Sequence, residues 1–390
     1  MKHERKYRST GGKGRFSRFR FAPLLQILFA VLLIGGVVLL FWKWILPLWS
    51  DLRHGEVSFS DPTPDGSTPS PSPTIAPTQD PATAHDLYYT DLETAQQEIV
   101  LPEYQYATDV SVDGDTLVFA VGDYTPDGTA AFVRLCEYDT TKDTYSYLAL
   151  PIENKSIRFP MRNDRWIVYF DSLPTGGGRL VAYNRITKEA TGFKTVHVGL
   201  PMPLLDGDTV VWMERTGQTR DKLFACDLLT METVTLDWLD NSDYGLSTPA
   251  FRDGTLFYAD ESGSLVRWVL ATNEKTVLPV STYVHDPKFN GTMLAYLSGN
   301  HGEDSDLYLY EESGPVCIAK GVVDFALGDT FVAYSRFDRT YVYFPDTDTT
   351  FCTTRQEEQS LLLAAGGKYL VWMDVTWRDK DIMEYMEITA

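Results

Sequence analysis

Cysteine and histidine are scarce in this chain of 390 residues, which has four Cys and six His. The cysteines lie far apart, without the short spacing of zinc ligands, at positions 136, 226, 317 and 352. Cys136 and Cys226 fall in apolar segments and are expected to be small core residues, whereas a Cys317–Cys352 disulfide is only a weak hypothesis. The sequence also lacks a G-x-S-x-G elbow, an H-E-x-x-H pair and a Walker loop, so we predict no cofactor and no enzyme of those classes.

A metal site has little support. The segment around Asp304 and Asp306 could offer carboxylate oxygens to calcium, but acidic loops are usually solvated turns.

Basic charge is lacking as well. Beyond residue 20 the chain has 26 Lys and Arg against 53 Asp and Glu, a balance of −27. Nucleic acids and anionic lipids are recognised by basic surfaces, so neither is an expected partner.

The N-terminal region has the one long hydrophobic run. Residues 1–20 carry eight Lys or Arg and one Glu, and residues 21–49 include an uncharged run from Leu24 to Trp42. This pattern predicts a basic cytoplasmic tail followed by a transmembrane helix. A cleaved signal peptide is the alternative, but Phe41 and Trp42 are bulky where cleavage requires small residues. We expect a single-pass protein of the cell membrane with the rest of the chain extracellular.

Residues 50–85 are predicted to be a disordered linker. The stretch from Glu56 to His85 holds seven of the 21 prolines together with many Ser and Thr, so it cannot bury a core. Such a segment favours extended polyproline conformations at about 3.1 Å per residue. It would therefore act as a stalk between the membrane and the domain that follows.

Residues 86–390 repeat one pattern of short alternating strands and tight turns. An aromatic residue marks each unit, at Phe119, Tyr169, Trp212, Tyr258, Tyr296, Tyr334 and Trp372. In six units a glycine that permits a tight turn precedes it, at Gly114, Gly207, Gly254, Gly291, Gly328 and Gly367, whereas the second unit has Asn163-Asp164. The period is that of four-stranded blades, so we predict an all-β, seven-bladed β-propeller, with six blades left open.

Two units carry a family resemblance. Pro249…Asp253-Gly254…Leu256-Phe257-Tyr258 and Pro287…Asn290-Gly291…Leu294-Ala295-Tyr296, with Asp306 to Tyr310, resemble repeats of TolB-type, WD40-like propellers. Other units depart from the pattern, since unit two lacks the glycine and unit six the proline. The resemblance implies a propeller fold over residues 86–390 and no particular activity.

The two ends of the domain are predicted to share its last blade. Glu98 to Leu101 resembles a fourth strand without a preceding blade, whereas residues 359–388 supply the missing inner strands. Sharing would close the ring and remove exposed edges. The third strand is left open between 86–91 and 382–388.

The candidate binding residues are aromatic and basic side chains on the longer loops. Loops between second and third strands, and between blades, vary in length and emerge at one face of a propeller, where insertions commonly form binding surfaces. The predicted contacts are Tyr124, Arg215, Trp238, Tyr244, Tyr283, His285, Arg336 and Trp377. We predict a module that binds a protein or a cell-wall polymer. A wall-glycan enzyme with carboxylates at the channel mouth and an extracytoplasmic sensor are the alternatives.

Overall fold

The computed structural model describes residues 96–104, 106–124, 130–154, 156–174, 176–199, 201–215, 220–240, 247–280, 283–299, 305–354, 358–376 and 382–389. The chain divides into two units, 1–75 and 76–390, and all described residues belong to the second. The predicted tail, transmembrane helix and linker, together with 86–95 of the predicted propeller, lie outside them. Within the described part, no helix has the length and hydropathy needed to cross a membrane.

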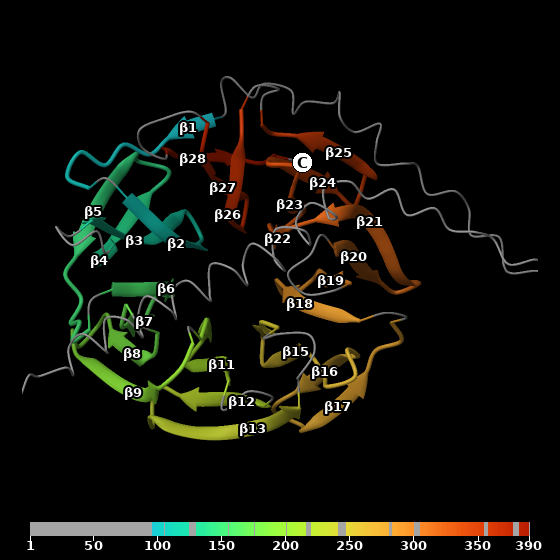
Figure 1. The fold of residues 1–390 in the computed structure, drawn as a ribbon, viewed down its shortest axis with the longest axis horizontal. Coiled ribbons are helices and arrows are strands. Elements are labelled where there is room, and N and C mark those ends of the chain that lie inside the picture. The colour runs from blue at the N-terminus through green and yellow to red at the C-terminus, as the bar shows by residue number, and fades with distance from the viewer. Residues whose placement is uncertain are drawn as a thin grey trace, which may run out of the picture. The chain divides into compact units, whose positions relative to one another are not determined.

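The described strands form seven antiparallel four-stranded sheets set in a ring (Figure 1). We number these blades 1 to 7 and give their strands from the centre outward. Blade 1 comprises β2 (Tyr106–Asp113), β3 (Thr116–Tyr124), β4 (Ala130–Asp139) and β5 (Thr144–Leu148). Blade 2 comprises β6 (Ser156–Arg162), β7 (Trp166–Ser172), β8 (Gly178–Asn184) and β9 (Ala190–Val196). Blade 3 comprises β10 (Leu204–Asp206), β11 (Thr209–Arg215), β12 (Arg220–Asp227) and β13 (Glu232–Asp240).

The remaining blades follow the same order. Blade 4 comprises β14 (Ala250–Arg252), β15 (Thr255–Ala259), β16 (Leu265–Val269) and β17 (Glu274–Val277). Blade 5 comprises β18 (Val284–Phe289), β19 (Leu294–Ser298), β20 (Ser305–Glu311) and β21 (Gly314–Val322). Blade 6 comprises β22 (Asp324–Leu327), β23 (Val332–Arg336), β24 (Arg339–Phe344) and β25 (Thr349–Cys352). Blade 7 comprises β26 (Ser360–Gly366), β27 (Tyr369–Asp374), β28 (Ile382–Glu387) and β1 (Gln96–Glu98).

The predicted repeat is confirmed with seven blades, which excludes the six-bladed alternative. Each of the seven marker aromatics lies within the second strand of its blade and is at most 2% exposed. Of the six predicted turn glycines, all but Gly328 have a positive φ. Gly328 is needed for space instead, because a Cβ there would lie 2.0 Å from the Phe331 ring. In the second unit the Asn163 side chain accepts hydrogen bonds from the backbone N–H groups of Arg165 and Trp166.

Both termini of the domain build blade 7, as predicted. The third place belongs to β28, and the fourth to β1, which pairs antiparallel with it. The strand predicted at Glu98 to Leu101 lies earlier in the chain, because the residues paired with β28 are Gln96–Glu98. Only one further backbone hydrogen bond, from Ile99 N to Met383 O at 2.9 Å, continues the pairing. Ile99 and Leu101 instead bury their side chains beneath the blade.

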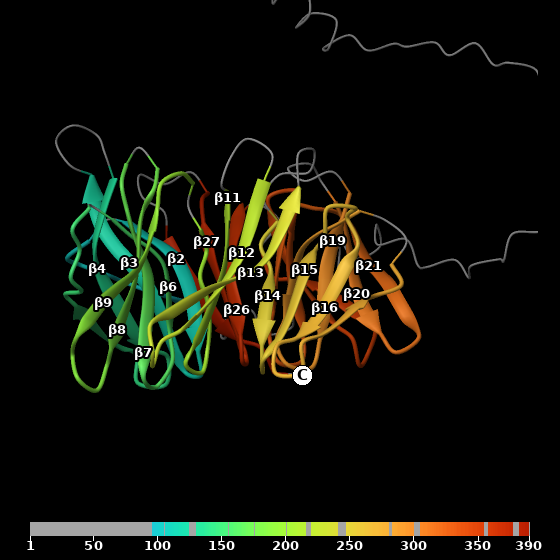
Figure 2. The same ribbon diagram turned by 90° about the horizontal axis from the view of Figure 1, so that it is seen from below.

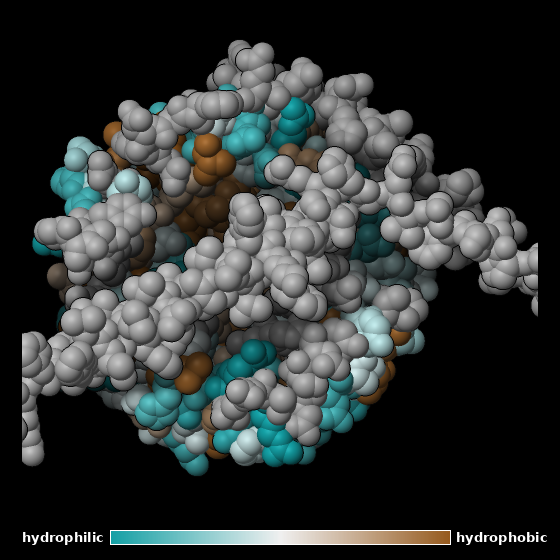
Figure 3. Space-filling view, viewed as in Figure 1, coloured by the Kyte–Doolittle hydropathy of each residue, from teal (hydrophilic) through white to brown (hydrophobic). Residues whose placement is uncertain are grey.

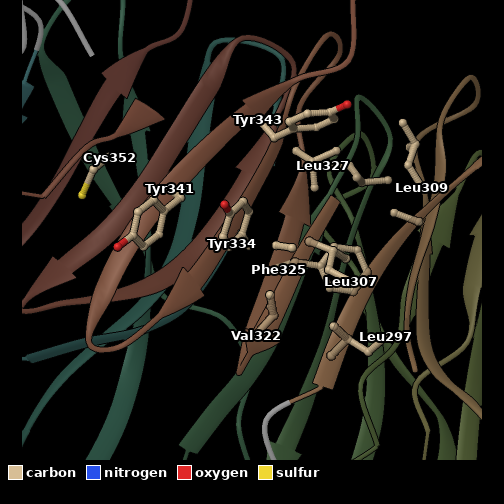
Figure 4. Close-up of a cluster of buried hydrophobic side chains, with 13 residues drawn as sticks. Leu297, Leu307, Leu309, Val322, Phe325, Leu327, Tyr334, Tyr341, Tyr343 and Cys352 are labelled. Atoms are coloured by element: carbon tan, nitrogen blue, oxygen red, sulfur yellow. The ribbon is translucent and has the colours of Figure 1, made fainter. Parts of the chain in front are cut away.

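The hydrophobic core consists of seven clusters, one between each pair of neighbouring blades. Figure 4 shows the cluster between blades 5 and 6, where Tyr334 and Tyr341 stack with ring centroids 5.3 Å apart. The cluster between blades 7 and 1 contains Ile99 and Leu101. All four cysteines are free thiols, so the Cys317–Cys352 disulfide is absent. Cys136 and Cys226 are buried, as predicted, and burial raises the pKa of Cys136 to about 12.

The two ends of the ring differ. Because neighbouring strands run antiparallel, the connections between second and third strands emerge at the same end as those between blades. We call this end the loop face and the opposite end, with the remaining hairpin turns, the turn face. Gly114 and Asp115 alone separate β2 from β3 at the turn face, whereas at the loop face β27 ends at Asp374 and β28 begins at Ile382. Figure 2 shows the sheets from the side, with the turn face along the lower edge.

Candidate functional site

The loop-face half of the ring holds every buried polar side chain of the described residues. These side chains come from blades 2, 3, 5, 6 and 7 and from the connections next to them, and most lie at strand ends. They are Ser156, Asp171, Ser172, Glu214, Asp221, Ser247, His285, Ser298, Ser305, Ser335, Thr340, Thr353, Thr354, Ser360, Asp374 and Glu384. Buried polar groups cost free energy unless they are hydrogen-bonded. Their confinement to one end of the ring indicates that they form hydrogen bonds needed at that end.

Carboxylates at this end of the ring fix the backbone of the loop-face connections by hydrogen bonds. The Asp171 carboxylate accepts hydrogen bonds from the backbone N–H of Glu153 at 2.7 Å and of Asn154 at 3.1 Å, which fixes the connection between blades 1 and 2. Burial raises the pKa of Asp171, and these two N–H groups oppose the shift. Asp286, in β18 of blade 5, accepts a hydrogen bond from the Thr248 N–H at 2.8 Å and so holds the connection that enters blade 4. The loop face is therefore pre-organised rather than simply solvated.

Trp238 lies at the outer edge of blade 3 and is 53% exposed. The register places Glu214 opposite Lys222 and Lys222 opposite Trp238, so the three residues form one row across β11, β12 and β13. The Lys222 Nζ atom is 3.7 Å from the centroid of the Trp238 ring, a cation–π contact. The Nζ of Lys194, from blade 2, is 3.5 Å from the Glu214 carboxylate. The row presents the Trp238 indole at the surface with the Lys222 ammonium group against its ring.

Arg215 ends β11 in the same blade. Its Nε lies 3.3 Å from the Oδ1 of Asp221, a carboxylate with no exposed surface. Burial raises the pKa of Asp221, and the Arg215 charge opposes that shift. Arg215 itself stays about one third exposed. Arg215 and Trp238, both predicted from the sequence, thus lie on the same blade but in adjacent register rows, which face opposite sides of the sheet. Lys222, beside Trp238, is a neighbour that the sequence analysis missed.

Tyr283 and His285 lie where the chain enters blade 5. Tyr283 is 51% exposed and packs over Gly263 of blade 4, where a Cβ would stand 2.6 Å from its Cδ1 atom. His285 is only 4% exposed, with Nδ1 3.0 Å from Asp286 Oδ2 and Nε2 3.0 Å from Ser305 Oγ. The two residues differ in environment, because Tyr283 is half exposed whereas His285 is buried beneath the loop.

The other candidates are distributed around the ring. Arg336 ends β23 in blade 6, and its guanidinium carbon is 4.7 Å from the centroid of the Phe337 ring. Tyr124 is the last residue of β3 at the loop face, and nothing is described of its side chain. Tyr244 and Trp377 lie outside the described residues, as does Asp304 of the calcium hypothesis. In the described part of the chain, no three His, Cys, Asp or Glu residues are grouped to hold a metal ion.

Two buried carboxylates, Asp374 on β27 and Glu384 on β28, lie near enough in blade 7 to influence each other electrostatically. Burial raises the pKa of Glu384, and the neighbouring charge of Asp374 adds to the shift. Glu384 Oε2 accepts a hydrogen bond from Trp372 Nε1 at 2.8 Å, and Asp374 Oδ1 accepts one from the Thr376 N–H at 2.8 Å. Both carboxylates are therefore engaged within the blade. They are nevertheless the described pair that bears most on the enzyme alternative.

The turn face has a polar groove of about 250 Å³ between blades 1 and 2, lined by residues that include Glu137, Tyr145 and Arg162. Arg162 bridges the two blades, with Nη1 2.8 Å from Asp113 and Nε 2.9 Å from Glu137. The charged groups of this groove are thus already paired across the blade boundary. It contains none of the predicted binding residues.

We expect Glu384→Gln to stabilise the domain at neutral pH. A carboxyl whose folded-state pKa is raised costs stability as the pH rises through the range between its unfolded and folded pKa values, about 1.4 kcal/mol per unit. Glutamine does not titrate, and its carbonyl can still accept from Trp372. Urea unfolding should show a gain at pH 7 that disappears near pH 3.5. Equal destabilisation at both pH values would contradict this reading.

No family model matches this chain, and no curated protein matches it. Solved structures do. The propeller domain of the Trilobed protease from Pyrococcus furiosus aligns with a TM-score of 0.54 and 8% identity, over 75% of this chain and 97% of that chain. Pyrococcus horikoshii acylaminoacyl peptidase aligns with a TM-score of 0.56 and 8% identity, over 76% of this chain and 54% of the peptidase, about half its length.

An oligogalacturonate lyase in complex with manganese aligns with a TM-score of 0.51 and 11% identity, over 75% of this chain and 93% of the lyase. At such identities the likeness shows the fold alone. The described domain is thus an all-β, seven-bladed β-propeller whose neighbours among solved structures include propellers. Because these neighbours belong to peptidases and a lyase, they favour neither a binding role nor an enzymatic one.

Proposed function

We propose that this protein is a membrane-anchored, extracytoplasmic propeller of the TolB-like, WD40-like type that binds a protein or a cell-wall polymer through its loop face. The basic tail, the apolar run of 21–49 and the linker support the anchored topology. The contacts are expected from Arg215, Trp238, Tyr283 and Arg336, with Tyr124, Tyr244 and Trp377 on the same predicted loops. His285 contributes by supporting the loop that carries Tyr283.

One observation carries this proposal: the loop face combines exposed aromatic side chains with a buried polar layer that fixes the loops beneath them. Trp238 and Tyr283 are each about half exposed. Aromatic and Arg residues dominate the energetics of recognition surfaces, and pre-ordered loops lower the entropic cost of binding. The proposal is tested by capture of a partner from intact cells with the propeller and with its loop-face variants.

The enzyme alternative rests on the Glu384 and Asp374 pair. Such an enzyme would require that pair to act on a wall glycan as acid and base. Purified protein that turns over a wall glycan, and loses that activity in Glu384→Gln, would favour the enzyme over the binding module. The sensor alternative would require a signal that depends on residues 1–20.

The proposed orientation of the chain across the membrane can be tested by proteolysis. Because residues 62–81 are predicted to lie in an extracellular linker, protease added to wall-stripped intact cells should cut there and release a fragment of the propeller's size. An immunoblot against the propeller would detect the fragment. Protection until the membrane is permeabilised would reverse the proposed orientation.

A further inference from the structure

We propose that the loop face of blades 6 and 7 is a docking surface for a protein partner, which inserts an apolar segment with a carboxylate beside it. This inference rests on the proposed function and decides between the two partner classes left open there. It is carried by a strained aromatic turn, by the apolar side chains around it and by one arginine.

The turn between β23 and β24 is the first observation. It consists of Phe337 and Asp338 alone, and Arg336 pairs with Arg339 across it. Both turn residues have a positive φ, of 51° and 58°. A two-residue hairpin with this geometry normally contains Asn-Gly or Asp-Gly, and a bulky aromatic at positive φ is an outlier. Phe337 is also 61% exposed, so burial of its ring in the domain does not repay the strain.

The second observation is a group of exposed aliphatic side chains around this turn, from Val323, Leu361 and Val375. Backbone hydrogen bonds place them together. The Val323 N–H donates to Ser335 O at 3.0 Å, just before the turn, and the Ser360 N–H donates to Asp338 O at 2.8 Å. The Val375 N–H donates to Gln359 O at 3.0 Å. Hence Phe337 and the three aliphatic residues form one patch across the boundary between blades 6 and 7, which we call the Phe337 patch.

Among the described residues, exposed large hydrophobic side chains are more numerous at the loop face than in the turn-face hairpins. Other exposed large apolar side chains at the loop face are Leu173, Val198, Met202, Trp238 and Tyr283. The described turn-face hairpins expose two, Ile186 and Leu229. Figure 3 views the loop face and shows a group of hydrophobic atoms at the position of β26 and β27. Contiguous apolar surface rimmed by polar residues is typical of protein interaction sites.

Charge supplies the third observation. Arg336 is partly exposed, and its guanidinium group lies against the Phe337 ring. The nearby carboxylate of Asp324 is engaged by Lys288 at 3.1 Å, and that of Asp374 by the Thr376 N–H. In a domain with a strong excess of acidic residues, this patch therefore offers an arginine to a carboxylate of the partner.

These features fit a protein better than a polysaccharide. Sugars are held by aromatic faces together with hydrogen-bonding groups, and Val323, Leu361 and Val375 offer no polar side-chain atom to a hydroxyl. An apolar segment of a protein gains free energy by covering the same side chains. A second copy of this chain is a less suitable occupant, since two domains of this charge repel each other.

The test replaces Leu361 in the full-length protein with the photo-crosslinking residue p-benzoylphenylalanine and irradiates intact cells. Ile186, exposed on the turn face, is the matched control position. We expect an adduct of defined mass at position 361 that proteinase removes and muramidase does not, and none at position 186. Arg336→Gln should reduce the adduct at least about tenfold, as expected for loss of a charged contact, while Arg336→Lys largely retains it.

Phe337→Asn separates recognition from folding. Asparagine tolerates positive φ, so this variant should melt at the same temperature or about 2 °C higher, yet lose most of the adduct. A lower melting temperature would show that Phe337 serves the fold, and would overturn the inference. So would a muramidase-sensitive adduct, a dimer of this chain, or no adduct at 361 when the probe at position 238 or 283 does yield one. Absence of adducts at all three positions would overturn the proposed function as well.

Discussion

A chain that begins at Tyr104 is expected to lose cooperative unfolding and to aggregate. Such a chain lacks β1, the fourth strand of blade 7, together with Ile99 and Leu101 of the core between blades 7 and 1. Burial of two such side chains contributes about 3–6 kcal/mol, a large share of the 5–15 kcal/mol by which domains are usually stable. The loss also leaves β28 as an open edge.

The matched control is a chain that begins at Asp86, which retains β1. Calorimetry and size-exclusion chromatography would compare the two. The control should melt in one sharp transition as a monomer, whereas the shorter chain should melt broadly or elute as aggregate. Identical melting temperatures would show that β1 does not hold the ring closed, despite the hydrogen bonds of Ile99 to β28 and of Tyr385 to Gln97.

Replacement of Trp238, Tyr283 and Trp377 by alanine is expected to abolish partner capture while leaving the melting temperature nearly unchanged. Trp238 and Tyr283 are half exposed, and substitutions at such positions usually alter stability by about 0.5 kcal/mol or less. Removing the Lys222 contact with the Trp238 ring costs about 0.5–1 kcal/mol at an exposed site. Aromatic residues at the centre of an interface are worth about 2 kcal/mol or more each in binding.

The matched control replaces Ile186 and Leu229 by alanine. Both are exposed apolar residues in turn-face hairpins, so this variant removes similar surface from the opposite end of the ring. It should capture the partner as the unmodified protein does. If the triple variant fails to fold, Trp238 and Tyr283 serve packing rather than recognition. Unchanged capture by the triple variant would move the binding site away from these residues.

The fold could be predicted because its signals are local and repeated. An aromatic residue such as Trp212 marks each second strand, and a residue that accepts positive φ, such as Gly114, indicates the turn before it. Closure of the ring was visible because the two ends complement each other. The exact register was not, since Glu98 to Leu101 looks like a strand by its alternation, while in the fold Ile99 and Leu101 fill the core below Gln96–Glu98. Packing of Ile99 and Leu101 against blade 1 determines where β1 ends. Alternation of apolar and polar residues in the sequence does not reveal this packing.

The site was less predictable for the same reason. The exposure of Trp238 and the burial of His285 depend on where each residue lies in its blade and on its contact with another strand, Lys222 for Trp238 and Ser305 for His285. The sequence pattern does not contain these contacts. Phe337 was missed because a two-residue turn of Phe-Asp carries no turn signal. The register of β23 with β24 is what reveals the missing Asn or Gly.

Recognition through the loop face of an extracytoplasmic propeller can be measured by capture of a partner from intact, wall-stripped cells. The unmodified domain from residue 86 onward, the triple alanine variant and the turn-face control would be added from outside, and bound material would be quantified. We expect saturable binding of a partner by the unmodified domain and by the control, and none by the triple variant. Equal capture by all three, or capture lost only in the turn-face control, would show that the loop face is not the recognition surface.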